Sequence, residues 1–268
     1  MQNVIFLSSG ITSWVAGLRT VERYGPEQCI GLFADTGVED PDNYRFLEES
    51  TAVLGIPLVK VDNGEDLWGN WERHNSIPNN RMAFCSRNLK QEPSRRWLKE
   101  NTSPETHRLI VGISWDEVHR IPAIEKGWAP YQVQFPMTEA PLLDKPTTLQ
   151  IARDHGIEPP RLYRYGLPHA NCGGGCVRAG MAQWRHVLEA LPEVFALWER
   201  KEAEMQQQTG KNCTILKRSI RGQNVPYSLR ELREEHERQI PLLDPNDWVR
   251  LLYGRLPKNL KRPVGTLG

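Results

Sequence analysis

The residues best suited to chemistry surround a pair of cysteines in the second half of the chain. Cys172 and Cys176 bracket three glycines, and His169 lies shortly before them. A flexible loop between two thiols can wrap a metal ion. With Cys85 as a third thiolate, we expect a 4Fe–4S cluster that has one iron open to substrate or sulfide. The same thiols with His169 would instead form a closed zinc site, and without a metal Cys172 and Cys176 could form a redox pair.

Cys85 also begins a segment of its own, in which Lys90, Arg95 and Arg96 follow. A cysteine at a helix start feels the positive end of the helix dipole, which favours the thiolate. The cations behind it can meet phosphate or sulfate oxygens. The alternative interpretation is a buried, inert cysteine beside a basic surface helix.

A third candidate lies near the start of the chain, where the apolar run Val4–Leu7 ends in small polar residues. A helical pattern follows at once, so the segment predicts a strand, a turn and a helix start. This geometry directs backbone N–H groups at an anion. The residues that could hold phosphate are Ser8, Ser9, Gly10, Thr12 and Ser13. An ordinary capped turn is the alternative, and the lysine of a Walker loop is missing.

The second predicted strand, residues 29–34, ends in Asp35, Thr36 and, after two more residues, Glu39. Polar residues at the carboxyl end of a parallel strand lie where open α/β sheets bind ligands. The segment could contact magnesium or a ribose. It could equally be a capped turn between strand and helix.

The elements that must position these residues alternate along the first half of the chain. Further strands are predicted at 56–61, 108–113 and 131–135, with helices at 41–54 and 86–101. Strands and helices in alternation with short connections predict an α/β fold with a doubly wound, mostly parallel sheet. After residue 176 the pattern is mainly helical.

Bulk properties exclude several classes of protein. The 268 residues carry a net charge of +1, which gives no global field towards nucleic acid or a membrane surface. No segment has the ~20 apolar residues that span a bilayer. Five cysteines without a leader argue against a disulfide framework, and we expect a cytoplasmic protein.

Four motifs in order resemble the phosphoadenosine phosphosulfate (PAPS) reductase-like branch of the adenine nucleotide α-hydrolase superfamily. Residues 8–13 (SSGITS) resemble the PP-loop SGGxDS, and residues 35–39 (DTGVE) resemble DTG[LV]E. Residues 85–93 are similar to CCxxxKxxP, and residues 112–120 to G-[IV]-R-x-x-E-S-x-x-R. The segment 169–177 is similar to one in uncharacterised bacterial and phage members.

The resemblance implies an enzyme that binds ATP or a PAPS-like nucleotide together with Mg²⁺. Its ATP-using relatives adenylate an acceptor and often then insert sulfur. The acceptor would be a nucleobase or nucleic acid, a sulfur donor protein would be a second partner, and a homo-oligomer is compatible. Lys90 and Arg120 would stabilise the leaving pyrophosphate, and Cys85 would take part in catalysis. The implied division is a PP-loop nucleotide-binding α/β domain at 1–165 and a Cys-containing loop with a helical region at 166–268.

The chain departs from the family pattern at several positions. Ser9 and Thr12 replace a glycine and an aspartate of the loop, and Ser86 replaces the second cysteine of the CC pair. The tail at 258–268 lacks the nucleophilic cysteine of true PAPS reductases. We therefore expect adenylation coupled to sulfur transfer. The alternatives are a sulfonucleotide reductase with a thiol outside the tail, and a non-catalytic nucleotide-binding protein of phage or defence origin.

Overall fold

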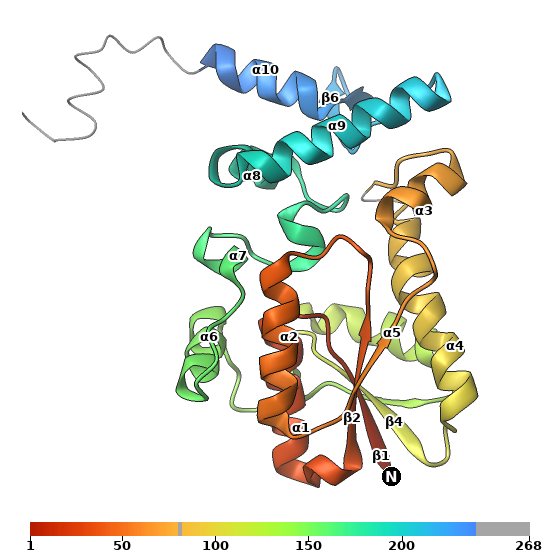
Figure 1. Cartoon of the computed structure of the whole chain (residues 1–268), viewed down its shortest axis with the longest axis vertical. Helices are drawn as coiled ribbons and strands as arrows, with labels where there is room; N and C mark the ends of the chain where they lie inside the picture. The colour runs from red at the N-terminus through yellow and green to blue at the C-terminus, as the bar shows by residue number, and fades with distance from the viewer. Residues whose placement is uncertain (80–81, 240–268) are drawn as a thin grey trace, which may run out of the picture.

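Five parallel strands form the central sheet of this chain, for which a computed structural model describes residues 1–79 and 82–239 (Figure 1). The strand order is β3-β2-β1-β4-β5. Successive strands are thus added on one side of β1 up to β3, and on its other side from β4 onwards. The strands are β1 (Gln2–Phe6), β2 (Cys29–Ala34), β3 (Leu58–Val61), β4 (His107–Val111) and β5 (Gln132–Gln134). This order confirms the doubly wound parallel sheet. The predicted tail at 258–268 lies outside the described residues.

Helices cover both faces of the sheet. The helices of this half are α1 (Ile11–Tyr24), α2 (Pro41–Leu54), α3 (Leu67–His74), α4 (Glu92–Asn101), α5 (Ile121–Trp128) and α6 (Lys145–Asp154). Successive strand residues point to opposite faces, so Ile5 packs with α1, α2 and α6, while its neighbour Val4 packs towards α4 and α5. Both faces are apolar because both are covered, as in parallel sheets generally.

Local signals set several element boundaries as predicted. Asp40 caps α2 by accepting the Asp42 N–H, and Gly55 ends the helix with a φ of 64°. The segment before α4 is a π-helix, Ser86–Gln91, that continues directly into α4. The strand predicted at 56–61 is shorter, because pairing with β2 begins only at Leu58.

The C-terminal region lies beyond the carboxyl ends of the strands, above the sheet in Figure 1. It contains α7 (Arg161–Arg164), α8 (Met181–Ala190), α9 (Pro192–Thr209) and α10 (Leu229–Gln239). The predicted helical character is confirmed, but the pattern did not predict the antiparallel hairpin β6 (Leu216–Ile220) and β7 (Gln223–Tyr227). Leu191 lies between α8 and α9, because Pro192 begins the second helix.

One apolar core joins this region to the first half of the chain. Trp71 of α3 packs edge-on against Trp198 of α9, with ring centroids 5.7 Å apart, and Trp198 also contacts Trp184 of α8. Leu89 of the π-helix belongs to the same cluster. The helical region is thereby fixed over the strand ends, where a ligand site is expected.

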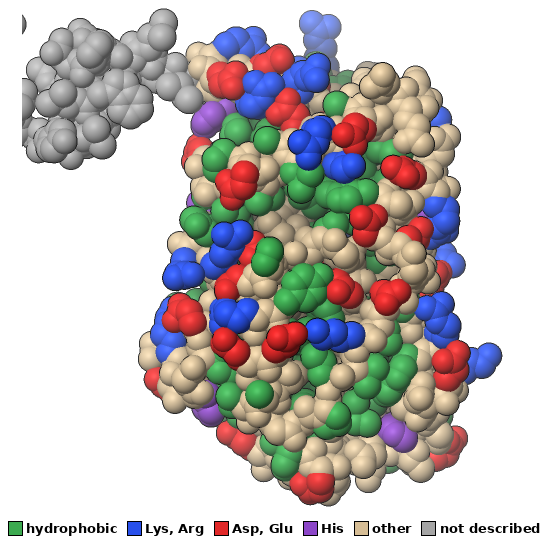
Figure 2. All heavy atoms as spheres, in the orientation of Figure 1, with side chains coloured by type: hydrophobic (Ala, Val, Ile, Leu, Met, Phe, Trp, Pro, Cys, Tyr) green, Lys and Arg blue, Asp and Glu red, His purple; other side chains and the backbone are tan. Residues whose placement is uncertain are grey.

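Charged side chains of both signs are interspersed on the face shown in Figure 2, in keeping with the small net charge. Among the helices of the described residues, none combines the length and apolar character needed to cross a bilayer.

Glu202 of α9 makes the stability of this region depend on pH. Its side chain is 1% exposed, and its carboxylate accepts the backbone N–H groups of Ile215 and Leu229 at 2.8 and 2.6 Å. Burial raises the pKa of Glu202 from 4.5 to about 7, despite these two hydrogen bonds. The folded state therefore holds this proton more tightly than the unfolded chain. The stabilisation that comes from protonated Glu202 is fully present below pH 4.5, and this contribution is lost as the pH rises through about 7.

We expect this loss to amount to roughly 3 kcal/mol, measured as the difference in unfolding free energy between wild type and Glu202→Gln. Urea denaturation at intervals from pH 4.5 to 8 measures it. The control is Glu204→Gln, on the same helix but half exposed, whose curve should run parallel to wild type. Parallel curves for wild type and Glu202→Gln would contradict the prediction.

Candidate functional site at the strand ends

A cavity of about 920 Å³ lies outside the carboxyl ends of β1 and β4. The strand order switches from one side of β1 to the other between these two strands, and open α/β sheets bind ligands at such a topological switch point. Its walls come from the loops after β1 and β4, the π-helix, the turn before α6 and the cysteine loop. The cavity is lined by these predicted site residues: Ser8, Gly10, Thr12, Ser13, Thr36, Cys85, Lys90, Arg120, His169, Cys172 and Cys176.

The turn after β1 presents hydroxyl and N–H groups to this cavity. The Ser8 N–H donates to the Ser13 Oγ, and the same Oγ lies 3.2 Å from the Ser8 Oγ. In the part of the chain that the structure describes, no acceptor faces the backbone N–H of Thr12 or Ser13. Ser9 is buried and does not line the cavity. The turn after β1 therefore offers backbone N–H and hydroxyl donors to an anion, but Ser9 is not among the residues that provide them.

Gly112, at the end of β4, allows this turn to sit against the sheet. A Cβ on Gly112 would lie 2.6 Å from the Cα of Ser13 and 3.0 Å from the Thr12 carbonyl oxygen. Both are backbone atoms, which cannot rotate away. The close approach of β4 to the start of α1 therefore requires glycine at this position.

The segment after β2 lies mostly behind the residues that line the cavity. Glu39 is buried, and its carboxylate accepts hydrogen bonds from the Thr36 hydroxyl at 3.1 Å and the Cys172 N–H at 2.7 Å. Asp35 accepts the Gly37 N–H and the Tyr44 hydroxyl. Only Thr36 of this segment lines the cavity. Glu39 thus joins this segment to the cysteine loop, and a contact of Asp35 or Glu39 with magnesium or ribose remains a prediction.

Two of the three thiols form a hydrogen-bonded pair. Cys172 has a φ of 51°, a left-handed conformation that is uncommon outside glycine, and its neighbour Gly173 is also left-handed. A hydrogen bond from the Cys172 thiol lowers the pKa of Cys176, assisted by the Arg178 N–H and the charge of Lys90. The same hydrogen bond, together with burial, raises the pKa of Cys172. Cys176 is therefore the more readily ionised thiol of the pair.

Cys85 and Lys90 lie beside this pair. Burial raises the pKa of Cys85, with a further contribution from Cys176, so the thiolate that we predicted at Cys85 is not supported. Burial would lower the pKa of Lys90, but Glu39 and the thiols outweigh it and raise the pKa. The Lys90 ammonium lies 3.8 Å from the Glu39 carboxylate. This cation supplies positive charge to the thiols.

Metal binding by Cys85, Cys172, Cys176 and His169 is not shown by this arrangement. Within residues 1–79 and 82–239, no three His, Cys, Asp or Glu side chains are grouped as metal ligands. His169 has Lys145, Glu117 and Arg120 as its charged neighbours, and burial with the two cations lowers its pKa. A three-thiolate cluster or a four-ligand zinc site is therefore not shown by this arrangement and stays a prediction, and no chemical step is derived through a metal.

Lys145 and Tyr163 are site residues that the sequence did not reveal. The Lys145 Nζ lies 3.3 Å from the Thr12 Oγ1 and 5.4 Å from the centre of the Tyr163 ring. The Tyr163 hydroxyl accepts the Ile11 N–H at 3.1 Å. Neither residue belongs to a recognisable motif. The helix α6 begins at Lys145 and is capped by Asp144, and only the fold brings this helix start to the turn after β1.

Arg120 also lines the cavity, from the loop after β4. It forms an ion pair with Glu117, whose side chain completes a capping box with Ser114. The Arg120 side chain is about half exposed. It can turn towards a ligand, but Glu117 already balances its charge.

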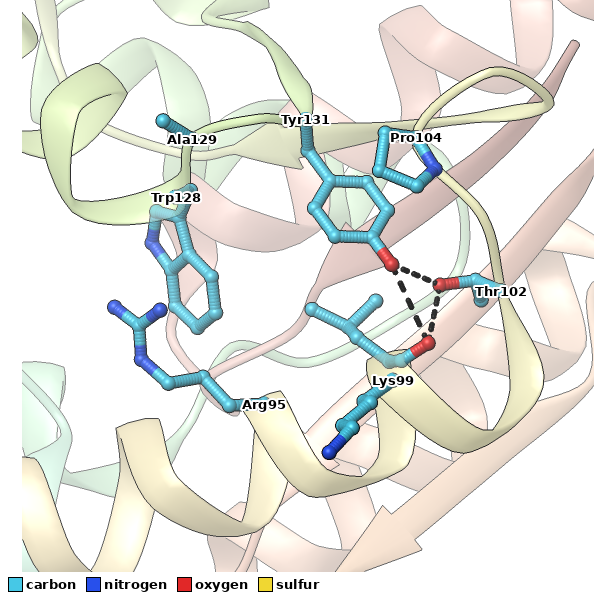
Figure 3. A pocket seen from close by; sticks show the side chains of 8 residues that line it. Arg95, Lys99, Thr102, Pro104, Trp128, Ala129 and Tyr131 are labelled. Atoms are coloured by element: carbon cyan, nitrogen blue, oxygen red, sulfur yellow. Dashed lines mark hydrogen bonds between the residues drawn. The ribbon is translucent and has the colours of Figure 1, made fainter.

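A second, smaller cavity of about 320 Å³ lies between α4 and β5 (Figure 3). The Tyr131 and Thr102 hydroxyls are hydrogen bonded at 2.7 Å, and the Arg95 guanidinium lies over the Trp128 ring. No thiol and no residue of the turn after β1 lines it. The larger cavity is therefore the candidate functional site.

The fold and the cavity together define a doubly wound α/β protein with a ligand site at the topological switch point. No protein-family model matches the sequence. It is 26% identical over 147 residues to the uncharacterised nin region protein ORF290 of Escherichia phage lambda. The match covers 45% of this chain, and it spans about half (51%) of the length of that relative.

Two similar solved structures are a PAPS reductase from Candida auris, in a phosphate complex, and an NH3-dependent NAD synthetase from Campylobacter jejuni, in complex with nitrate. The first is 14% identical with a TM-score of 0.47, covering 64% of this chain and 81% of that one. The second is 14% identical with a TM-score of 0.39, covering 78% and 87%.

Proposed function

We propose that this chain is an enzyme that binds ATP or a related adenylyl nucleotide and adenylates an acceptor for sulfur transfer. The observation that carries the proposal is that one cavity contains both the donor-rich turn after β1 and a thiol pair, Cys172 and Cys176. The volume of about 920 Å³ suits a nucleotide together with part of an acceptor.

The chemistry would proceed in three displacements. An acceptor oxygen attacks the α-phosphorus of ATP, and pyrophosphate leaves. A persulfide on Cys176, loaded by an external persulfide donor, then attacks the activated acceptor carbon, and AMP leaves. Cys172 attacks the Cys176 Sγ to release the sulfur to the acceptor, which leaves a Cys172–Cys176 disulfide for an external dithiol to reduce. The acceptor class we favour is a nucleobase, free or within a nucleic acid.

A sulfonucleotide reductase is the second candidate, favoured by the lowered pKa of Cys176 beside a second thiol. The Cys176 thiolate would attack the sulfur of a sulfonucleotide and release the nucleotide. Cys172 would then attack the Cys176 Sγ of the sulfocysteine, so that sulfite leaves and a disulfide forms. The two thiols supply the two electrons, which accounts for a chain whose tail lacks a cysteine.

Product analysis tests these functions on the full-length protein. Labelled ATP with candidate nucleobase and RNA acceptors should yield AMP and pyrophosphate, and Cys176→Ser should keep pyrophosphate release while losing sulfur incorporation. Sulfite from PAPS, lost in Cys176→Ser, would establish the second candidate instead. Nucleotide binding without any product would overturn both and leave a binding protein.

A further inference from the structure

The turn after β1 lacks the lysine that phosphate-binding loops often carry, yet a lysine reaches it from a distant part of the chain. The Lys145 Nζ lies 3.3 Å from the Thr12 Oγ1, although the two residues are 133 positions apart. Lys145 lines the same cavity as Ser8, Gly10 and Thr12. Its ammonium group is therefore placed where phosphate oxygens held by the turn would lie.

The position of Lys145 is fixed by its neighbours. Asp144 caps α6 by accepting the Thr147 N–H at 2.9 Å, which sets the direction of the first helical residue, Lys145. The Trp115 Nε1 donates to the Leu143 carbonyl at 3.1 Å and ties this turn to the loop after β4. The Lys145 side chain then lies over the Tyr163 ring, whose hydroxyl accepts the Ile11 N–H of the loop.

The charge of Lys145 is less well balanced than those of Lys90 and Arg120. Lys90 lies 3.8 Å from the Glu39 carboxylate, and Arg120 is ion-paired with Glu117. Within the described ranges 1–79 and 82–239, no carboxylate lies within ion-pair distance of the Lys145 Nζ. Asp116 and Glu117 act on it only from farther away. A half-buried ammonium that meets a hydroxyl and an aromatic face favours an anionic ligand.

We infer that Lys145 is a phosphate-binding residue of the nucleotide site, supplying from α6 the cation that the loop sequence lacks. The inference rests on the proposed function for the identity of the nucleotide, but the chemistry it requires is that of a phosphate or pyrophosphate group. Lys145 would hold the phosphates, while Lys90 lies beside the thiols. The two lysines thus serve opposite ends of one cavity.

The test compares Lys145→Met, Lys145→Arg and the control Lys126→Met, an exposed lysine of α5, in calorimetric titrations of the full chain with ATP, inorganic pyrophosphate and adenosine. A charge-assisted contact to phosphate predicts that Lys145→Met weakens ATP and pyrophosphate binding roughly 10- to 100-fold. Adenosine binding should stay unchanged, Lys145→Arg should retain most of the affinity, and Lys126→Met should match wild type.

The melting temperature separates binding from a structural role. Because no carboxylate of the described residues forms an ion pair with Lys145, Lys145→Met should melt at the wild-type temperature or above it. Equal pyrophosphate binding by wild type and Lys145→Met, or a lowered melting temperature with a uniform loss for all three ligands, would overturn the inference. Lys145-dependent binding of pyrophosphate without any binding of ATP would support Lys145 as an oxyanion contact and reject the nucleotide function.

Discussion

Glu39→Gln is expected to lower the free energy of unfolding by roughly 2–4 kcal/mol, because it removes one partner of a buried, hydrogen-bonded charge. The Glu39 side chain is 2% exposed and lies 3.8 Å from the Lys90 Nζ. One of its oxygens accepts the Cys172 N–H, and the other accepts the Thr36 hydroxyl. A glutamine would place an amide NH2 against one of these donors and leave the Lys90 charge without its partner.

Denaturant titration of Glu39→Gln and Glu48→Gln measures this effect against a matched control. Glu48 pairs with Lys60 on the surface, and its side chain is 68% exposed. Replacing it should change stability by less than about 1 kcal/mol. If the two variants lose the same stability, Glu39 does not hold the cysteine loop in place. Reaction rates of Cys176 with a thiol reagent should also change in Glu39→Gln alone, since Glu39 bonds the neighbouring loop.

Gly112→Ala is expected to abolish measurable nucleotide binding and to destabilise the protein by roughly 1–3 kcal/mol. The added Cβ would lie 2.6 Å from the Ser13 Cα, well inside van der Waals contact. Either β4 or the start of α1 has to move, and the donors of the turn after β1 would move with it. Binding should suffer more than stability, because small displacements of several donors act together on one ligand.

The control is Gly127→Ala in α5, where an added Cβ meets nothing within 4 Å. Alanine favours a helix over glycine, so this variant should be as stable as wild type or more stable by up to about 1 kcal/mol. ATP titration and thermal melting of both variants give the comparison. Wild-type affinity in Gly112→Ala would show that the turn after β1 does not contact the nucleotide.

Local patterns sufficed to predict the fold of the first half. The inner strands β1, β2 and β4 are short and largely apolar, and α2 has clear boundary signals, with Asp40 and Pro41 at one end and Gly55 at the other. The hairpin β6–β7 was missed because its strands show no regular alternation of apolar and polar residues, and β7 contains a proline. Its stability comes from packing on α9 and α10, which periodicity does not record.

Site residues could be predicted from the sequence where the groups that act together lie within one short segment. The turn after β1, the thiols and Lys90 were recognised from residue types, and the structure places them around one cavity. Lys145 and Tyr163 were missed because their role depends on contacts with residues 11 and 12, far earlier in the chain. The three thiols, although far apart in the sequence, lie around the Lys90 ammonium, but metal binding by them stays a prediction.

The shared tryptophan core has a consequence for how this chain matures during translation. Trp71 and Leu89 leave the ribosome long before Trp184 and Trp198, the residues that cover them, have been synthesised. Until then α3 and the π-helix carry an uncovered apolar surface, the kind of segment that chaperones hold and that aggregates when elongation stalls. Because these contacts join distant segments, closure of the cavity must come late in folding.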